Sequence, residues 1–329
     1  MVYLVADDCN TSEIAFENNQ MVVLKPEIAL KSKLKSIQYA VANFSRKHQS
    51  IVIFDPDNLA HPDCLSEINK FHNLGFKAVQ GRRTAKNLDS FYACLDAAGE
   101  YYYNYVQRSA PFSLGSSATI AGSGMAILAE DYINFLQSEP IKLFHTENKV
   151  IVAEDKMLQV ALVKQGNVIA FAKNAIIYDE KVVSGQQVQR QRTRWINSYF
   201  IHLKDGLELF KIGIKRLNFN QLYFAYISIL PPMFLQVGFA FIFAIINIFY
   251  SLPQFLMVTG ALFIFAFNFL FTLYLGKAPL QVWKSLWGLP IFMGRQVLAL
   301  FHLGKSNKDF MVTKKNSQVK LEDLLSTSK

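Results

Sequence analysis

Two aspartates flank a proline at positions 55–57, directly after the apolar run Ile51–Phe54. At an extended strand end, residues two apart point to the same side, so Asp55 and Asp57 can face one ligand together. Two carboxylates on one side can share a hard cation, Mg²⁺ or Mn²⁺, which would also bind phosphate oxygens. Asp-Pro-Asp-Asn is also a run of turn residues, and taken alone it favours an ordinary turn.

A second pair of acids, Glu154-Asp155, stands directly before the helical stretch Lys156–Lys164. Acidic residues are common at helix N-termini because they interact favourably with the helix dipole, and this is the ordinary explanation. The alternative is a general base that lies above a ligand site, and Asp155 is the candidate for it.

The segment Gln191-Arg-Thr-Arg-Trp195 is harder to explain as ordinary structure. Spacings of three and four residues place Gln191, Arg194 and Trp195 on one helical face. An arginine can pair with a phosphate through two hydrogen bonds, and an indole offers a flat surface to a sugar ring. A basic amphipathic helix at a membrane also explains the arginine and the tryptophan, but it does not require Gln191.

Two further groups are weaker signals. Asp7 and Asp8 follow the first apolar run of the chain. In Gly122-Ser123-Gly124, small residues would let the backbone approach a ligand closely, although such a run is often only a loop.

The elements that must position these residues are short β-type runs, which alternate with longer helical stretches over residues 1–200. Such alternation predicts an α/β domain with a mostly parallel, Rossmann-like sheet covered by helices on both faces. Ligands gather at the carboxyl ends of the strands in such sheets, which is where both aspartate pairs stand. The predicted strands are Val2–Ala6, Met21–Leu24, Ile51–Phe54, Ala78–Gln80 and Val168–Phe171, and the predicted helices are Glu27–Arg46, Pro62–Asn73 and Phe91–Arg108.

Residues 217–276 contain no charged residue, and this run is too long for a core helix. Because a membrane span needs roughly 20 apolar residues, the run fits two crossings with a turn at Ser251–Pro253. Lysine and arginine flank the run and are absent from the turn, which predicts that both soluble ends are cytoplasmic. The predicted segments are a linking or interface helix at 201–220, spans near 222–249 and 254–276, an interface helix or third span at 280–303, and a polar tail at 304–329.

The net charge of +9 has two candidate causes. One is binding of nucleic acid, and the other is the positive cytoplasmic side of a membrane protein together with an anionic substrate. The basic residues favour the second cause, because Lys211 and Lys215 precede the apolar run and Lys277 and Lys284 follow it. We therefore expect no nucleic-acid partner. The three cysteines show no paired spacing and predict a reducing compartment without structural zinc.

Together these motifs resemble the family 2 inverting glycosyltransferases, and most closely the membrane-integrated cellulose, hyaluronan and poly-N-acetylglucosamine synthases. The hallmark of that family is D, DxD, ED and QxxRW in this order, and the resemblance covers nearly the whole chain. The segment 310–315 also resembles the FxVTxK gating loop of cellulose synthase. The matching residues are Asp7, Asp55-Pro-Asp57, Glu154-Asp155, Gln191-Arg-Thr-Arg-Trp195 and, in the gating loop, Phe310, Val312, Thr313 and Lys315.

The resemblance implies a GT-A fold that binds a UDP-sugar with a divalent cation, Mg²⁺ or Mn²⁺. Asp7 would contact the uracil with Asp8 beside it, and Lys33 would reach the same base. Asp55 and Asp57 would bind the diphosphate and the metal ion.

The same resemblance implies the remaining roles. Gln191 and Arg194 would hold the diphosphate, while Asp155 would deprotonate the acceptor hydroxyl. Trp195 would stack under the acceptor sugar. The acceptor pocket would be lined by Gly122, Ser123, Gly124 and Met125.

The implied reaction is an inverting transfer from a UDP-sugar to a growing polysaccharide on the cytoplasmic face of a membrane, with other synthase subunits as candidate partners. Transfer of a single sugar to a lipid acceptor needs the same site, and two spans form a thin wall for a channel, so this alternative stays open. A second alternative is an inactive relative that binds nucleotide-sugar as the subunit of a complex.

The chain departs from the family at its start. The family begins with an apolar strand that ends in Pro-x-Asn-Glu, whereas this chain begins with what would be the second strand. Ser32 and Leu34 replace the two glycines that flank the lysine in the family. We expect the chain to be an N-terminally incomplete version of the family's fold, in which Val2–Ala6 lacks a neighbouring strand.

Overall fold

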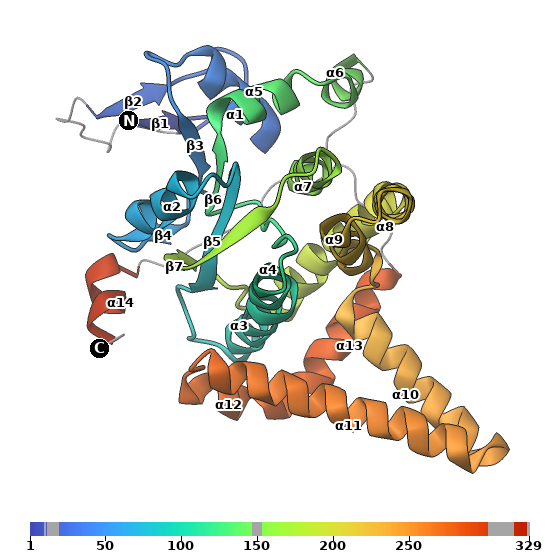
Figure 1. Cartoon of the computed structure of the whole chain (residues 1–329). Helices are drawn as coiled ribbons and strands as arrows, with labels where there is room; N and C mark the ends of the chain where they lie inside the picture. The colour runs from blue at the N-terminus through green and yellow to red at the C-terminus, as the bar shows by residue number, and fades with distance from the viewer. Residues whose placement is uncertain (10, 12–19, 147–152, 302–318, 328–329) are drawn as a thin grey trace. The chain divides into compact units, whose positions relative to one another are not determined.

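The computed structural model describes residues 1–9, 11, 20–146, 153–301 and 319–327. The chain divides into two compact units, each made of two stretches of chain. Figure 1 labels the helices and strands. The first unit contains residues 1–52 and 127–154, and the second contains residues 53–126 and 155–329.

The first unit contains a small parallel sheet of β1 (Val2–Val5) and β2 (Met21–Leu24), both close to where the sequence predicts them. The helix expected over 27–46 is shorter in the structure, where α1 spans Lys33–Ala42. It begins late because Lys31 has a left-handed backbone and Ser32 is extended, so that the Ser32 side chain caps the first turn. The unit also contains α5 (Ala129–Leu136) and α6 (Glu139–Thr146).

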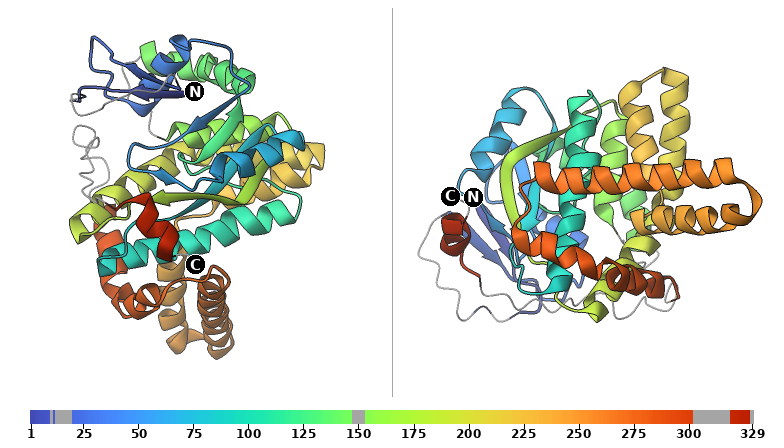
Figure 2. Two further views of the ribbon diagram at one scale, coloured as in Figure 1. Left: turned by 90° about the vertical axis from the view of Figure 1, so that its left-hand side faces the viewer. Right: turned by 90° about the horizontal axis from the view of Figure 1, so that it is seen from below.

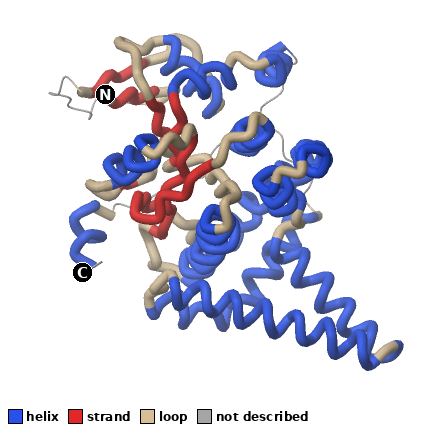
Figure 3. The backbone as a smooth tube through the Cα atoms, in the orientation of Figure 1, coloured by secondary structure: helices blue, strands red, loops and turns tan. Residues whose placement is uncertain are grey.

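A five-stranded sheet has the order β3-β6-β5-β7-β4. Strands are drawn in red in Figure 3. β5 and β7 are parallel, whereas β4 runs antiparallel to β7. Gly124 N donates to Ile53 O and Ala129 N donates to Gln49 O, so the bonds progress in opposite directions and β3 and β6 are antiparallel. The sheet is therefore mixed, and the expected mostly parallel, Rossmann-like character is met only in part. The strands are β3 (Ser50–Ile53), β4 (Leu59–Ala60), β5 (Ala78–Ala85), β6 (Met125–Leu128) and β7 (Ile169–Asp179).

Two of these strands, β4 and β6, lie outside the sequence prediction. β6 has only four residues, and a short apolar run has no periodicity that distinguishes a strand from a helix. The pairing of β5 with β7 also continues well beyond the predicted strand ends, past an irregularity between Gly81 and Arg82. These extensions carry Arg83 and Asp179, two charged residues of the site described below.

Helices cover both faces of this sheet. All of Ala78–Gly81 in β5 is buried, although successive side chains in a strand point to opposite faces. α2 (Cys64–Asn73) packs on β5 and β7, α3 (Phe91–Tyr103) packs on β5, and α4 (Ala110–Ser113) packs on β7. A π-helical segment, Asn104–Ser109, joins α3 to α4, and such segments occur frequently at functional sites.

One helix of 32 residues, α8 (Gly185–Arg216), carries the Gln-x-x-Arg-Trp segment. The Ser184 side chain caps its start, and Leu217 ends it in a left-handed conformation. The predicted division at residue 200 falls inside this continuous helix. α8 packs against α9 (Phe219–Ile229) and α13 (Leu289–Leu300).

α10 (Met233–Tyr250) and α11 (Leu252–Leu275) form a helical hairpin (Figure 2). Within the described part of the chain, these two helices are long and apolar enough to cross a membrane, with mean hydropathies of 2.0 and 2.1. The turn at Ser251 lies where the sequence predicts it, but α10 begins at Met233 instead of near residue 222. Pro231 and Pro232 separate α10 from α9, because proline lacks a backbone N–H and disfavours helix in the preceding residue.

The helix expected over 280–303 is interrupted. The structure has α12 (Leu280–Ser285), a 3₁₀ turn at Leu286–Gly288, and then α13. Pro290 lies in the first turn of α13, where its missing N–H costs no hydrogen bond. The last helix is α14 (Leu321–Thr327). The four residues of the predicted gating loop lie outside the described residues, namely Phe310, Val312, Thr313 and Lys315.

Candidate active site

The Asp55-Pro-Asp57 segment forms a turn directly after β3. Asn58 N donates to Asp55 O over 3.0 Å, and Asp55 N donates to the Asn58 side-chain oxygen over 3.2 Å. The Asp57 carboxylate accepts a hydrogen bond from Glu180 N over 3.3 Å, and Lys86 Nζ donates to the Asp57 carbonyl over 3.2 Å. The segment is therefore the turn that its composition indicates, and the turn holds two half-buried aspartates in fixed places.

The loop Gly122-Ser123-Gly124 contacts this turn, because the Ser123 hydroxyl donates to the side-chain oxygen of Asn58. Gly122 and Gly124 have φ angles of 77° and 63°, in the left-handed region that favours glycine. The buried Gln80 amide donates to the carbonyls of Ser123 and Gly124 over 3.0 and 3.3 Å. The loop leads directly into β6, so this unpredicted strand fixes one end of it.

Asp155 lies beside the same loop, in the first turn of α7 (Glu154–Lys164). A β-carbon added to Gly122 would lie 3.2 Å from Asp155 Oδ2, so a side chain there would crowd the carboxylate. One turn later, the Gln159 side-chain oxygen accepts a hydrogen bond of 2.8 Å from the backbone of Ile120. The structure therefore brings the predicted base and the predicted glycine loop together.

Gln191, Arg194 and Trp195 lie on one face of α8, as their spacing predicts. Trp195 is 38% exposed, and Arg194 is half-buried. The side-chain oxygen of Gln191 is buried and has no hydrogen-bond partner among the described residues. Leaving such an oxygen unpaired is costly, which makes it a candidate to accept a hydrogen bond from a ligand.

Arg192, on the inner side of the same helix, was missed by the sequence analysis. It is buried and pairs with Asp96 of α3, with Arg192 Nη2 2.5 Å from Asp96 Oδ1. Its guanidinium carbon lies 4.2 Å from the centre of the Trp195 ring and 5.7 Å from that of Phe292 in α13. A signal for the pair was present, because Asp96 is the one charged residue in the otherwise uncharged stretch Phe91–Gly99.

A cluster of buried charges joins α3, the π-helical segment, β5 and the end of β7. Glu100 pairs with Arg108 at 2.8 Å, with Lys181 at 3.3 Å and with Arg83 at 3.8 Å. Asp179 pairs with Arg83 at 2.5 Å and with Lys181 at 3.1 Å. No spacing in the sequence reveals this cluster, because its members are up to about a hundred residues apart.

This charge cluster contacts both loops of the site. Asp179 accepts a hydrogen bond of 3.2 Å from the Asn58 side chain, which belongs to the aspartate turn. Arg83 Nη1 donates to the carbonyl of Ala121 over 2.8 Å, next to the first glycine of the loop. The buried charges therefore fix the turn and the loop relative to each other.

The cluster keeps Glu100 and Lys181 ionised despite burial. Burial alone would raise the pKa of Glu100, but Lys181, Arg83 and Arg108 together lower it to about 2. Burial alone would lower the pKa of Lys181, but Glu100 and Asp179 raise it. Each charge is stable in the interior because of its neighbours.

Comparison with known families decides the class of the protein. The family model described as glycosyltransferase-like family 2 matches residues 1–198, more than half of the chain. The chain belongs to glycosyltransferase family 2. It is therefore an enzyme that transfers a sugar from a nucleotide-sugar donor to an acceptor. The match includes all four motifs and ends within α8, so the α10–α11 hairpin lies beyond it. A comparison with curated proteins gave no match.

The residues that the sequence analysis assigns to the uracil of the donor belong to the first unit of this glycosyltransferase. The Asp7 carboxylate accepts hydrogen bonds from Leu30 N over 2.7 Å and from Lys31 N over 2.8 Å. Asp8 has a left-handed backbone with a φ of 53°, and Lys33 is the first residue of α1. Asp7 therefore holds the chain segment that leads into Lys33.

A divalent cation is compatible with the acids of the aspartate turn. The described residues contain no group of three or more His, Cys, Asp or Glu side chains that could hold a metal ion by themselves. Mg²⁺, however, is usually bound by one or two carboxylates together with substrate phosphates and water. Asp55 and Asp57, half-buried in the same turn, supply such a pair of carboxylates.

Proposed function

We propose that this glycosyltransferase is an inverting enzyme that transfers a sugar from a UDP-sugar to a growing polysaccharide on the cytoplasmic face of a membrane. The observation that carries the proposal is the contiguity of the aspartate turn, the glycine loop and Asp155. Ser123 bonds to Asn58 of the turn, and Gly122 of the same loop lies against Asp155. Carboxylates suited to a diphosphate and its cation therefore stand close to a candidate proton acceptor.

In the proposed reaction, the Asp155 carboxylate takes the proton of the acceptor hydroxyl while the hydroxyl oxygen attacks the anomeric carbon of the donor sugar. The bond from that carbon to the UDP oxygen breaks in the same step, and UDP leaves with the bonding electrons. The attack comes from the side opposite to the leaving group, so the configuration at the carbon inverts. Removal of a proton by a positioned side chain contributes roughly 10²–10⁴-fold to such rates.

The α8 face is assigned to the diphosphate and the acceptor. Arg194 stabilises the charge that develops on the leaving UDP, and the Gln191 side-chain nitrogen donates to a diphosphate oxygen. The unpaired side-chain oxygen of Gln191 can accept a hydrogen bond from a ligand hydroxyl. The exposed part of Trp195 provides a platform for the acceptor sugar, which the Gly122–Gly124 loop also borders in the proposed site.

The uracil is assigned to Asp7, Asp8 and Lys33. The support for this assignment is local, because Asp7 orders the backbone at Leu30 and Lys31 directly before Lys33.

Asp55 and Asp57 are assigned to a Mg²⁺ or Mn²⁺ ion together with the donor diphosphate. Such an ion, when bound, would neutralise part of the diphosphate charge. EDTA should abolish transfer, and added Mg²⁺ or Mn²⁺ should restore it. Full activity after exhaustive chelation would contradict the metal assignment.

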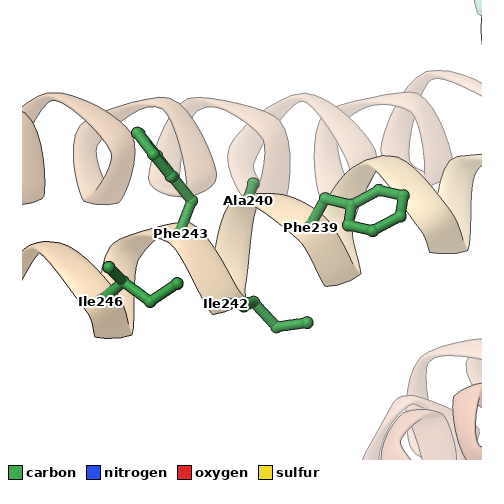
Figure 4. A pocket seen from close by; sticks show the side chains of 5 residues that line it. All are labelled: Phe239, Ala240, Ile242, Phe243 and Ile246. Atoms are coloured by element: carbon green, nitrogen blue, oxygen red, sulfur yellow. The ribbon is translucent and has the colours of Figure 1, made fainter.

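The α10–α11 hairpin is assigned to the membrane. Only 17% of the most apolar 18-residue stretch of each helix is buried inside the protein, whereas a core helix of a soluble protein would be mostly buried. Large apolar side chains of α10 project outward along a shallow surface (Figure 4). Bilayer hydrocarbon suits such a surface and water does not. The exposed side chains of this face are Phe239, Ile242, Phe243 and Ile246.

The catalytic region and the C-terminal tail are assigned to the cytoplasm. Lys215 and Arg216 precede the apolar run, Lys277 and Lys284 follow it, and the turn at Ser251 has no basic neighbour within the run. Basic residues concentrate on the cytoplasmic side of membrane proteins.

Transfer of a single sugar to a lipid acceptor is the second candidate. The described residues contain two helices that could cross a membrane, and two helices form a thin wall for a polymer channel. A lipid acceptor would need no channel and could reach the same site from the bilayer.

Product analysis separates these candidates. Membranes that contain the protein are incubated with labelled UDP-glucose or UDP-N-acetylglucosamine, and the products are sized against membranes without the protein. Long polymer supports the first proposal, whereas a lipid that carries one sugar supports the second. Absence of any transfer, from these and other UDP-sugars, would contradict both.

A further inference from the structure

Arg192 has no role in the transfer described above, although it stands inside the Gln-x-x-Arg-Trp segment. It is directed away from the face shared by Gln191 and Arg194, and it is buried. Its guanidinium carbon is 4.2 Å from the centre of the Trp195 ring. At this distance a guanidinium and an indole attract each other, and the cation covers one face of the ring.

We propose that Arg192 is a positioning residue that fixes the Trp195 ring, so that the outer face of the indole receives the acceptor sugar. This inference rests on the proposed function, in which Trp195 is the acceptor platform. Because Arg192 occupies the inner face, a sugar can stack only on the opposite one. The Trp195 residue is 38% exposed, which leaves surface for such a contact.

Asp96 holds the guanidinium in place. The two side chains are 10% and 7% exposed, and the ion pair measures 2.5 Å. A buried arginine requires such a partner, because an unpaired charge in the interior is strongly destabilising. The Phe292 ring of α13 lies 5.7 Å from the same guanidinium carbon. Contacts from α3 and α13 therefore determine where Arg192 lies, and through it the plane of Trp195.

The same helix, α3, also positions the aspartate turn. Glu100 follows Asp96 by four residues, so the two carboxylates lie on one side of α3. Glu100 pairs with Lys181 at 3.3 Å, Lys181 pairs with Asp179, and Asp179 accepts from Asn58. One helix thus carries both the support of the acceptor platform and the support of the turn assigned to the donor.

The test uses Arg192→Lys, because Arg192→Ala would leave Asp96 buried without a partner and could prevent folding. Lysine keeps the positive charge opposite Asp96 but lacks the planar group that stacks on an indole. Arg190→Lys is the matched control, since Arg190 is exposed on the same helix. Trp195→Ala reports whether the platform itself binds sugar.

Each purified full-length variant is assayed for equilibrium binding of cellobiose, of chitobiose and of UDP, and for its thermal unfolding midpoint. Arg192→Lys should weaken disaccharide binding about tenfold and leave UDP affinity and the midpoint at the values of Arg190→Lys. Trp195→Ala should abolish disaccharide binding. A purely structural role for Arg192 would instead lower the midpoint and weaken both ligands.

A second readout does not depend on the acceptor. The chain has three tryptophans, so replacing Trp283 and Trp287 by phenylalanine leaves Trp195 as the single indole. The fluorescence anisotropy of Trp195 should fall in the Arg192→Lys variant, because the ring becomes more mobile, and should not fall in Arg190→Lys.

The outcomes separate this inference from the proposed function. Trp195→Ala could abolish disaccharide binding while Arg192→Lys keeps the disaccharide affinity and the Trp195 anisotropy of the wild type. In that case the positioning role is wrong and the platform stands. If Trp195→Ala binds as the wild type does, or the wild type binds neither disaccharide, the platform is wrong and the inference falls with it. A lowered midpoint with weakened UDP binding in Arg192→Lys also overturns the inference.

Discussion

The second unit buries charged side chains in one region and exposes apolar side chains in another. Near the aspartate turn, Arg83, Glu100, Asp179 and Lys181 form ion pairs with little solvent exposure. In the α10–α11 hairpin, by contrast, only 17% of the apolar stretch of each helix is buried inside the protein. A soluble protein follows the reverse rule, in which charges remain outside and large apolar patches are covered.

The contrast agrees with the proposal that the two regions serve different environments, the hairpin that of a membrane. Burying ion pairs is a weak source of stability, because removal of water from the charges offsets much of their attraction. What the buried pairs do provide is a fixed geometry for Asn58 and Ala121, which belong to the two loops of the site. Exposure of the apolar surface of the hairpin is favourable in bilayer hydrocarbon and unfavourable in water.

Breaking the buried region should have the largest effect on stability. Asp179→Asn removes the partner of Arg83 and Lys181 and leaves three cations against the single carboxylate of Glu100. Breaking a buried pair in this way costs about 3–5 kcal/mol of unfolding free energy. It should also weaken sugar transfer, because Asn58 loses the carboxylate that accepts its hydrogen bond. Denaturant unfolding of the detergent-solubilised protein measures the first effect, and UDP release measures the second.

A surface pair is the control for this variant. Asp63 is exposed and lies 3.6 Å from His61, so Asp63→Asn should leave both stability and activity near the wild-type values. Equal effects of the two substitutions would contradict the positioning role of the buried charges.

The pH dependence of stability is a second test of the buried charges, through Glu100. The pKa of Glu100 is about 2 in the folded protein, below the value of 4.5 for an unperturbed glutamate. Its stabilisation is therefore complete above about pH 4.5 and is lost as the pH falls toward 2. The difference in unfolding free energy between the wild type and Glu100→Gln should shrink by roughly 3 kcal/mol over that interval. A difference that stays constant between pH 5 and pH 2 would contradict the pKa shift.

The membrane topology of the exposed hairpin can be tested by labelling. The substitutions needed for this test should have the smallest effect on activity and stability. Single cysteines replace Leu252 in the hairpin turn or Lys320 in the tail, in a background without Cys9, Cys64 and Cys94. A membrane-impermeant maleimide added to intact cells should label residue 252 and should label residue 320 only after lysis. Reaction at 320 but not at 252 in intact cells would reverse the proposed topology.

The sequence predicted those features that depend on local spacing. The acids at 55–57 and at 154–155 were located by their position after a strand or before a helix. The structure places Asn58 of the aspartate turn, and Asp155, against the glycine loop. The shared face of Gln191, Arg194 and Trp195 follows from helical spacing alone. The hairpin turn at Ser251 follows from an uncharged run with a proline near its middle.

The features that the sequence did not predict depend on contacts between distant segments. Arg83, Glu100 and Asp179 are ordinary charged residues until the fold brings them together. Arg192 stood within the motif, but helical spacing shows neither that it is buried nor that Asp96 is its partner. β6 was missed because a run of four apolar residues has no distinguishing period.

The central claim is that Asp155 accepts the proton of the sugar acceptor, and one measurement tests it most directly. Asp155→Asn keeps the shape of the side chain and removes its basicity, so the turnover of the purified enzyme should fall on the order of a hundredfold or more. UDP affinity should remain at the wild-type value, because Asp155 does not hold the donor. Turnover of Asp155→Asn close to that of the wild type, with Glu154 intact, would contradict the account.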